Sequence, residues 1–134
     1  MSMSSFRALL WGGALVTMLV AACLGYYLHL KGVAGRNAQV LAVDWNPDRT
    51  CSITTYAPSL GERSIRSRLF RLFTAPTFFR VHDQEGDLLR SSEWRLWERE
   101  AGEFEPPQWI GNGRVLYPTT RGYAQWELPA CVRK

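Results

Sequence analysis

The stretch ALLWGGALVTMLVAACLGYYLHL, residues 8–30, decides how this chain is organised. It contains no Asp, Glu, Lys or Arg. As a helix it would be roughly 34 Å long, and the hydrocarbon layer of a bilayer is about 30 Å thick. We therefore predict a transmembrane helix over residues 8–30, preceded by a short tail at residues 1–7. Trp11 near one end and Tyr26 and Tyr27 near the other are typical interfacial anchors.

Cys23 lies within this segment and leaves three interpretations of it. A cleaved secretory signal is disfavoured, because the apolar run continues well beyond the roughly 7–15 residues of a signal peptide. The sequence Val-Ala-Ala-Cys at residues 20–23 resembles a bacterial lipoprotein box, in which Cys23 would be acylated. We favour an uncleaved helix in which Cys23 is a small apolar side chain, since free cysteine packs like a hydrophobe. Lipidation at Cys23 stays open as the alternative.

The two remaining cysteines, Cys51 and Cys131, lie near the two ends of the rest of the chain. This pair suits a disulfide in an oxidising compartment, where closing a loop of about 80 residues would contribute roughly 3–5 kcal/mol. The distribution of positive charge favours the opposite orientation, with the C-terminal part in the cytoplasm, because Lys31 and Arg36 follow the apolar segment and only Arg7 precedes it. We give the cysteines more weight. They predict a single-pass protein of a bacterial inner membrane with its C-terminal domain in the periplasm.

Residues 31–37 are interpreted as a linker, and residues 38–134 as one small periplasmic domain. Runs of alternating or β-branched residues predict short strands, separated by turns rich in Gly, Asn and Asp. These strands are expected at residues 39–45, 51–56, 77–83, 87–92, 109–110, 114–117 and 123–128. The fold class is therefore mainly β (α+β), a small antiparallel meander of six or seven strands preceded by the transmembrane helix.

One amphipathic helix is expected within residues 60–73, because apolar residues recur there at spacings of three and four. They are Ile65, Leu69, Leu72 and Phe73, and the arginines between them are Arg63, Arg66, Arg68 and Arg71. We expect the apolar side of this helix to cover one face of the sheet. The four arginines are candidates for contact with anionic lipid headgroups, at about 1 kcal/mol each. A solvated arginine face is the alternative.

Residues 83–105 carry eight acids against three arginines. The acids at the end of this stretch are flanked by tryptophans, and this combination is typical of a surface that attracts and anchors a protein partner. The candidate partner-binding residues are Trp94, Trp97, Glu98, Glu100, Glu103, Glu105 and Trp109. Alternatively, these tryptophans fill a small core. A nucleic-acid partner is a poor fit, because a domain outside the cytoplasm rarely meets one and the net charge is only +4.

Catalytic chemistry is sparse in this sequence. The domain has one imidazole, His82, and no Gly-x-Ser-x-Gly pattern. No spacing of His, Cys and carboxylates suggests a closed zinc site, and no motif suggests a cofactor. Paired acids within residues 98–105 would suit a glycosidase only if they flanked a cleft, and an exposed acidic loop is the simpler interpretation. We predict that the protein is not an enzyme and uses neither a metal nor a cofactor.

Residues 69–92 resemble a family of small membrane-anchored proteobacterial proteins. The similarity lies in Pro76-Thr77-Phe78-Phe79-Arg80-Val81-His82-Asp83, which fits a Pro-x-Phe-Phe-Arg-x-x-Asp core before a turn, and in a following Leu-x-x-Ser stretch. Members are often encoded beside effectors of the type VI secretion system. The resemblance implies an immunity or accessory protein that neutralises a secreted toxin by surface complementarity, and it names no catalytic residue. The acidic insertion at residues 97–107 departs from the family pattern.

A structural or assembly subunit of an envelope complex is the rival interpretation, and it would require specific contacts by the transmembrane helix itself. Gly12, Gly13 and Gly25 provide only a weak pattern of small residues for such contacts. The sequence leaves the identity of the partner and the oligomeric state open.

Overall fold

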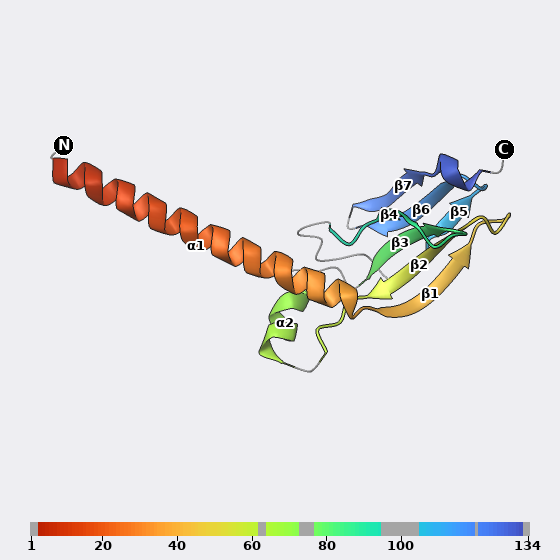
Figure 1. Ribbon diagram of the computed structural model, residues 1–134, viewed down its shortest axis with the longest axis horizontal. Coiled ribbons are helices and arrows are strands. Elements are labelled where there is room, and N and C mark those ends of the chain that lie inside the picture. The colour runs from red at the N-terminus through yellow and green to blue at the C-terminus, as the bar shows by residue number, and fades with distance from the viewer. Residues whose placement is uncertain (1–2, 62–63, 73–76, 95–104, 120, 133–134) are drawn as a thin grey trace. The chain divides into compact units, whose positions relative to one another are not determined.

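A computed structural model describes residues 3–61, 64–72, 77–94, 105–119 and 121–132 (Figure 1). The chain divides into two compact units, Met1–Gly32 and Val33–Lys134. The predicted residues Arg63, Phe73, Trp97, Glu98, Glu100 and Glu103 lie outside the described residues.

The N-terminal unit is a single helix. α1 spans Met3–Arg36, and its last turn, from Val33, belongs to the second unit. Within α1, the stretch Trp11–Arg36 contains an 18-residue window with a mean hydropathy of 1.7, and it is long and apolar enough to cross a membrane. Large apolar side chains are exposed on several sides of the helix, as lipid contact would require. They include Trp11, Leu15, Val16, Met18, Leu19 and Val20.

α1 continues through most of the stretch that the sequence assigns to a linker, and the compact domain begins at Val33 instead of residue 38. Isolated glycines do not end the helix here, because one glycine costs only about 1 kcal/mol in a helix interior. A Cβ at Gly35 would overlap the carboxylate of Glu93, which would have to shift from its ion pair with Arg80. The backbone carbonyl of Ala34 also accepts a hydrogen bond from the Ser59 amide at 3.2 Å.

The domain contains seven strands in two antiparallel sheets, and this confirms the predicted mainly β (α+β) class. β1 (Gln39–Trp45), β2 (Cys51–Ala57), β3 (Phe78–Asp83) and β4 (Leu88–Ser91) form the first sheet. β5 (Gln108–Ile110), β6 (Arg114–Thr119) and β7 (Gly122–Glu127) form the second. In both sheets the strands lie side by side in the order of the sequence, as in a meander. A short 3₁₀ helix, Pro129–Cys131, follows β7.

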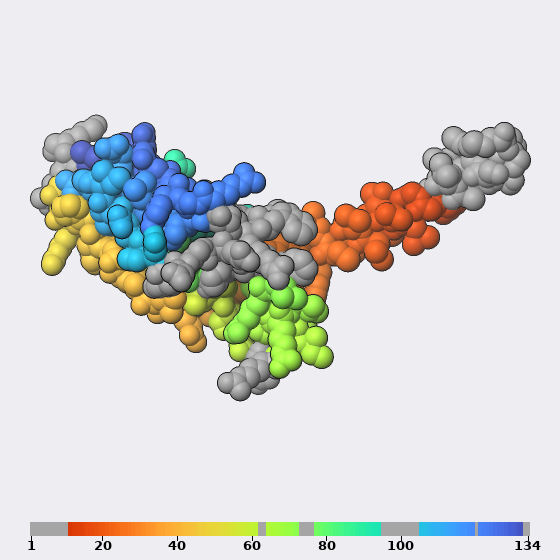
Figure 2. Space-filling model, turned by 180° about the vertical axis from the view of Figure 1, so that it is seen from behind, coloured from red at the N-terminus to blue at the C-terminus, as the bar shows by residue number. Residues whose placement is uncertain are grey.

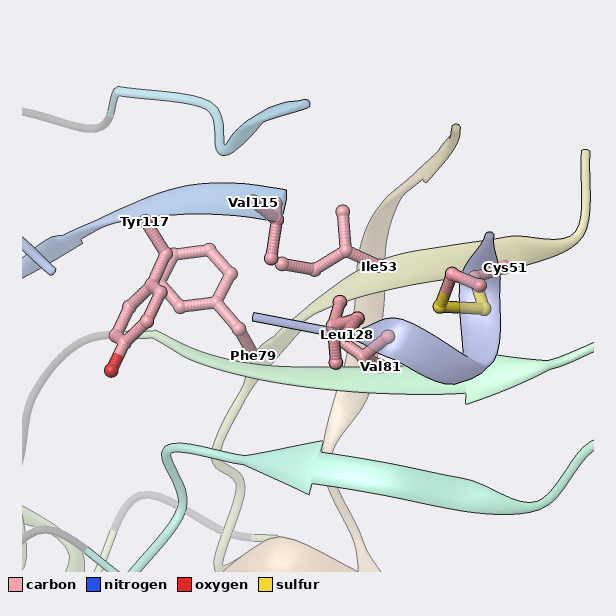
Figure 3. Packing of buried hydrophobic residues seen from close by; sticks show 8 residues of the cluster. Cys51, Ile53, Phe79, Val81, Val115, Tyr117 and Leu128 are labelled. Atoms are coloured by element: carbon pink, nitrogen blue, oxygen red, sulfur yellow. A yellow bond between two sulfur atoms is a disulfide. The ribbon is translucent and has the colours of Figure 1, made fainter. Parts of the chain in front are cut away.

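The core lies between the two sheets (Figure 3). The first sheet contributes alternate residues of β2 and β3, since successive side chains of a strand point to opposite faces. The second sheet contributes residues of β6 and of the segment that follows β7. The buried cluster is Cys51, Ile53, Phe79, Val81, Val115, Tyr117, Leu128 and Cys131. Tyr117 contacts aromatic rings on both sides, with ring centroids 5.8 Å from Phe79 and 4.0 Å from Trp126.

The predicted disulfide joins the two sheets. Cys51 opens β2 of the first sheet, Cys131 follows the second sheet, and both are fully buried. The buried side chain of Asn46 organises the same corner. Its amide nitrogen donates to Thr50 Oγ1 at 2.8 Å and to the carbonyl of Asn112 at 3.1 Å, and its Oδ1 accepts from the Thr50 and Cys51 amides. The turn between β1 and β2 is thereby tied to the turn between β5 and β6.

The short helix α2 spans Ile65–Leu72, in the connection between β2 and β3. The expectation that its apolar stripe covers a sheet is wrong, because Ile65, Leu69 and Leu72 are exposed and only Phe70 is buried. The physical reason is that the two sheets already cover each other's inner faces, so that the core is closed without the helix. The helix itself lies within the predicted residues 60–73.

Candidate interaction surfaces

The outer face of the first sheet, on the side away from the core, carries three rows of side chains across paired strands. Opposite residues of an antiparallel pair lie on the same face. The strand register therefore places Val40, Tyr56 and Phe78 in one row, Val43, Thr54 and Arg80 in a second, and Trp45, Ser52 and His82 in a third. Each row runs from an apolar residue of β1 to an aromatic or basic side chain of β3.

The β3 end of this face is tightly packed. The rings of Tyr56 and Phe78 stack with centroids 5.2 Å apart, and the guanidinium carbon of Arg80 lies 4.9 Å and 5.0 Å from those centroids. Arg80 also forms an ion pair with Glu93 at 2.6 Å and donates to the carbonyl of Gly35 at 3.4 Å. Because cation, rings and carboxylate hold one another, this part of the face is a structural unit.

The β1 end of the face is different, because its apolar side chains are open to solvent. On this face Val40, Val43 and Trp45 are 58%, 47% and 50% exposed. Leu41, at the register shift of β1, is 49% exposed, and we call these four residues the β1 strip. β1 is an edge strand of its sheet. Natural edge strands usually carry charges or prolines that block pairing with other chains, and an apolar edge is a ready contact site. An open hollow of about 590 Å³ at this end of the strip is lined by Trp45, Arg49 and Gln84.

His82 is half-buried on the same outer face, two residues after Arg80 on β3. Burial lowers the pKa of this imidazole, the Arg80 guanidinium lowers it further, and the Asp83 carboxylate opposes both effects. In the described part of the chain, no three His, Cys, Asp or Glu side chains are grouped so that they could hold a metal ion.

The predicted partner-binding residues that the structure describes differ in their exposure to solvent. Trp94 is 55% exposed and Glu105 is exposed. Trp109 is half-buried against the core, and its indole nitrogen donates to the carbonyl of Asp44 at 3.2 Å. Trp126 also packs on the core. Trp109 therefore fits the core-filling alternative, whereas Trp94 is available for contact.

The other predicted site residues lie in helices. Arg66, Arg68 and Arg71 are exposed on α2, which stands out from the surface of the domain in Figure 2. Cys23 is a free, exposed cysteine in α1, and the helix continues without interruption on both sides of it.

Four residues of the Pro-x-Phe-Phe-Arg-x-x-Asp pattern, Phe78, Phe79, Arg80 and Asp83, have structural roles in this fold. Phe78 stacks on Tyr56, and Phe79 enters the core from the opposite face of β3. Arg80 binds Glu93, and the Asp83 carboxylate accepts a hydrogen bond from the Asp87 amide in the turn before β4. These four residues are thus explained by the architecture of β3 and its turn.

Sequence reasoning missed the β1 strip. The available signal was the nearly unbroken apolar run of residues 39–45, in which Asp44 is the one charge. Such a run is typical of a strand that is covered on both faces. The position of β1 at a sheet edge leaves it uncovered instead.

Comparison with known proteins identifies no relative of this chain. No family model matches this chain, and neither the curated proteins nor the solved structures contain a match.

Proposed function

We propose that this protein is a membrane-anchored binding protein, held by α1 in a bacterial inner membrane with its domain in the periplasm. Two observations support the location. α1 is long and apolar enough to span a bilayer. The Cys51–Cys131 disulfide closes a loop of 80 residues, and disulfides of this kind persist in oxidising compartments.

The observation that carries a binding role is the β1 strip. Trp45 is half exposed at one end of the strip, and tryptophan is among the residues that most often dominate binding energy at interfaces. Burying the strip against a protein would remove apolar surface from water at about 25 cal/mol per Å². The packed Arg80 unit beside it supplies a rigid platform, so a partner would dock without ordering this face first.

The narrower proposal is that the partner is a secreted toxin, and that the protein is an immunity or accessory protein of the type VI secretion kind. It rests on the sequence resemblance at residues 69–92. A protein that neutralises a toxin in the envelope needs a complementary surface and a tether, and both are consistent with the features described above.

A protection assay tests this function. Cells that lack the protein are mixed with the parental strain, and survival is compared after complementation with the full chain or with its variants. Trp45→Ser should abolish protection, whereas Tyr123→Ser is a matched control, since both aromatic side chains are 50% exposed. The amount of protein and its disulfide are checked in both variants.

Each outcome of this assay bears on one part of the proposal. Survival of the cells that lack the protein would contradict the immunity role. Full protection by Trp45→Ser would remove the β1 strip as the binding surface. Location is tested separately with alkaline phosphatase fused after Lys134, which is active only outside the cytoplasm, and inactivity of the fusion would contradict the periplasmic domain.

We further propose that α1 is retained uncleaved, with Cys23 as an apolar residue within it. The apolar run that continues beyond Cys23 to Leu30 supports this choice, since the sequence after the cysteine of a lipoprotein usually turns polar. Metabolic labelling with a fatty-acid probe separates the two. Label that disappears in Cys23→Ala would establish acylation and contradict the proposal.

A further inference from the structure

The apolar stripe of α2 points away from the domain. Ile65, Leu69 and Leu72 are 78%, 54% and 47% exposed. At about 100° per residue, these three side chains fall within an arc of about 60°. Phe70, which is buried, and Ser67, which is half-buried, lie about 140° and 160° from Ile65, on the opposite side of the helix. α2 is therefore held by one face and presents its apolar face to the outside.

Arginines surround this stripe. Arg66, Arg68 and Arg71 are exposed, and α2 contains no acidic residue. On the helical wheel, Arg66 and Arg68 lie on either side of the stripe, about 100° and 60° from Ile65. Long arginine side chains can extend sideways from an apolar surface and keep their charges in a polar layer. An apolar stripe between cations is the arrangement of helices that lie in the interface of anionic membranes.

The covalent path keeps α2 close to the start of the domain. The amide of Ser59 donates to the carbonyl of Ala34, the second residue of the domain, at 3.2 Å. α2 begins six residues after Ser59, and six residues span at most about 20 Å. Ala34 in turn follows the N-terminal unit almost directly. Chain length alone therefore keeps α2 within short reach of any surface that holds α1.

We propose that α2 binds the anionic phospholipid surface of the membrane into which α1 is inserted, with Ile65, Leu69 and Leu72 at the acyl boundary and the arginines among the phosphates. The inference rests on the proposed function, because α1 supplies the bilayer. We favour a bilayer over a protein partner for two reasons. The apolar stripe is narrow and faces outward, and the arginines that flank it have no acidic residue on α2 to neutralise them. Each arginine near an anionic surface should raise the ratio of docked to undocked α2 about fivefold, and three arginines together should raise it on the order of 100-fold.

Reconstituted full-length protein tests the proposal. In a Cys23→Ala background, Leu69→Cys is labelled with an environment-sensitive NBD dye, and Gln125→Cys, an exposed position of β7, is the reference site. The protein is inserted into vesicles of phosphatidylcholine alone or with one quarter phosphatidylglycerol. We expect lipids with a spin label on the acyl chain to quench the dye at Leu69 only, and more strongly in the anionic vesicles.

Two sets of glutamine substitutions separate charge from apolar contact, since glutamine is a good helix former. Arg66→Gln, Arg68→Gln and Arg71→Gln together should abolish the extra quenching in anionic vesicles. The matched control, Arg90→Gln, Arg114→Gln and Arg121→Gln, removes three exposed arginines elsewhere in the domain and should preserve it. Ile65→Gln with Leu72→Gln should reduce quenching at Leu69 in both vesicle types.

The outcomes distinguish the two levels of the proposal. If the protein fails to float with the vesicles, α1 is not an anchor and the proposed function fails. If it floats but the dye at Leu69 is quenched no more than the dye at Gln125, the interfacial role of α2 is overturned. A blue shift at Leu69 that depends on protein density and occurs without lipid quenching would assign the stripe to a second copy of the chain, and would likewise overturn the proposal.

Discussion

Removal of the Cys51–Cys131 disulfide should cost about 4.5 kcal/mol of unfolding free energy. The two cysteines are 80 residues apart. The chain-entropy relation for a loop of this length gives about 15 cal/mol/K, or about 4.5 kcal/mol at 25 °C. A domain of this size is usually stable by roughly 5–15 kcal/mol, so the loss is a large part of the total. Cys→Ala is the proper substitution, since both side chains are fully buried and serine would bury unpaired hydroxyls.

Urea unfolding of the full chain in detergent, followed by tryptophan fluorescence, measures this loss. The parent for comparison is Cys23→Ala, which leaves only the two domain cysteines. At a slope near 1.5 kcal/mol/M, the midpoint of Cys51→Ala with Cys131→Ala should fall by about 3 M. Reduction of the parent should give a similar shift.

Two results would refute this reasoning. One is a midpoint for the double variant within about 0.5 M of the parent, which corresponds to less than about 1 kcal/mol. The other is rapid alkylation of both thiols in the folded, unreduced parent, which would mean that the bond is absent. The second result would also remove the main support for an oxidising compartment.

Three further predictions concern single residues of the domain. Thr55→Val should stabilise it by about 1 kcal/mol in urea unfolding, because the buried Thr55 hydroxyl has no hydrogen-bond partner among the described residues; a loss of stability would contradict this. Gly35→Ala should destabilise it by about 1–3 kcal/mol through overlap with Glu93, whereas Gly25→Ala, with open space around it, should be neutral. Because the pKa of His82 is lowered in the folded state, stability should fall as the pH drops from about 7 through 6.5, and His82→Gln should flatten this dependence while His29→Gln should not.

The strands could be predicted from the sequence because their signals are local. The expected strand at residues 39–45 coincides with β1, and the turn before β4 contains a glycine, Gly86, at φ +90°. Alternation, turn chemistry and the spacing of two cysteines act over short ranges or through covalent geometry. The division of the meander into two facing sheets depends on which apolar faces meet, and no local pattern encodes it.

The candidate surfaces were harder to predict, because exposure is a property of the whole domain. The periodicity of residues 65–72 correctly indicated a helix, but it did not show whether the stripe points inward or outward. Phe70, which lies off the stripe, was the residue that became buried. The β1 strip poses the same problem, since its apolar composition resembles that of a buried strand and its exposure follows from its place at the edge.

The order of strands in the two sheets has a consequence for biogenesis. Every residue of the first sheet precedes residue 92, whereas the second sulfur of the disulfide is at residue 131, after the second sheet. A chain that is delivered across a membrane from its N-terminal end can therefore pair β1 to β4 early, through contacts that are close in sequence. Cys51 then remains a thiol until Cys131 arrives. Oxidation of this pair therefore follows the delivery of β5 to β7, which precede Cys131 in the chain.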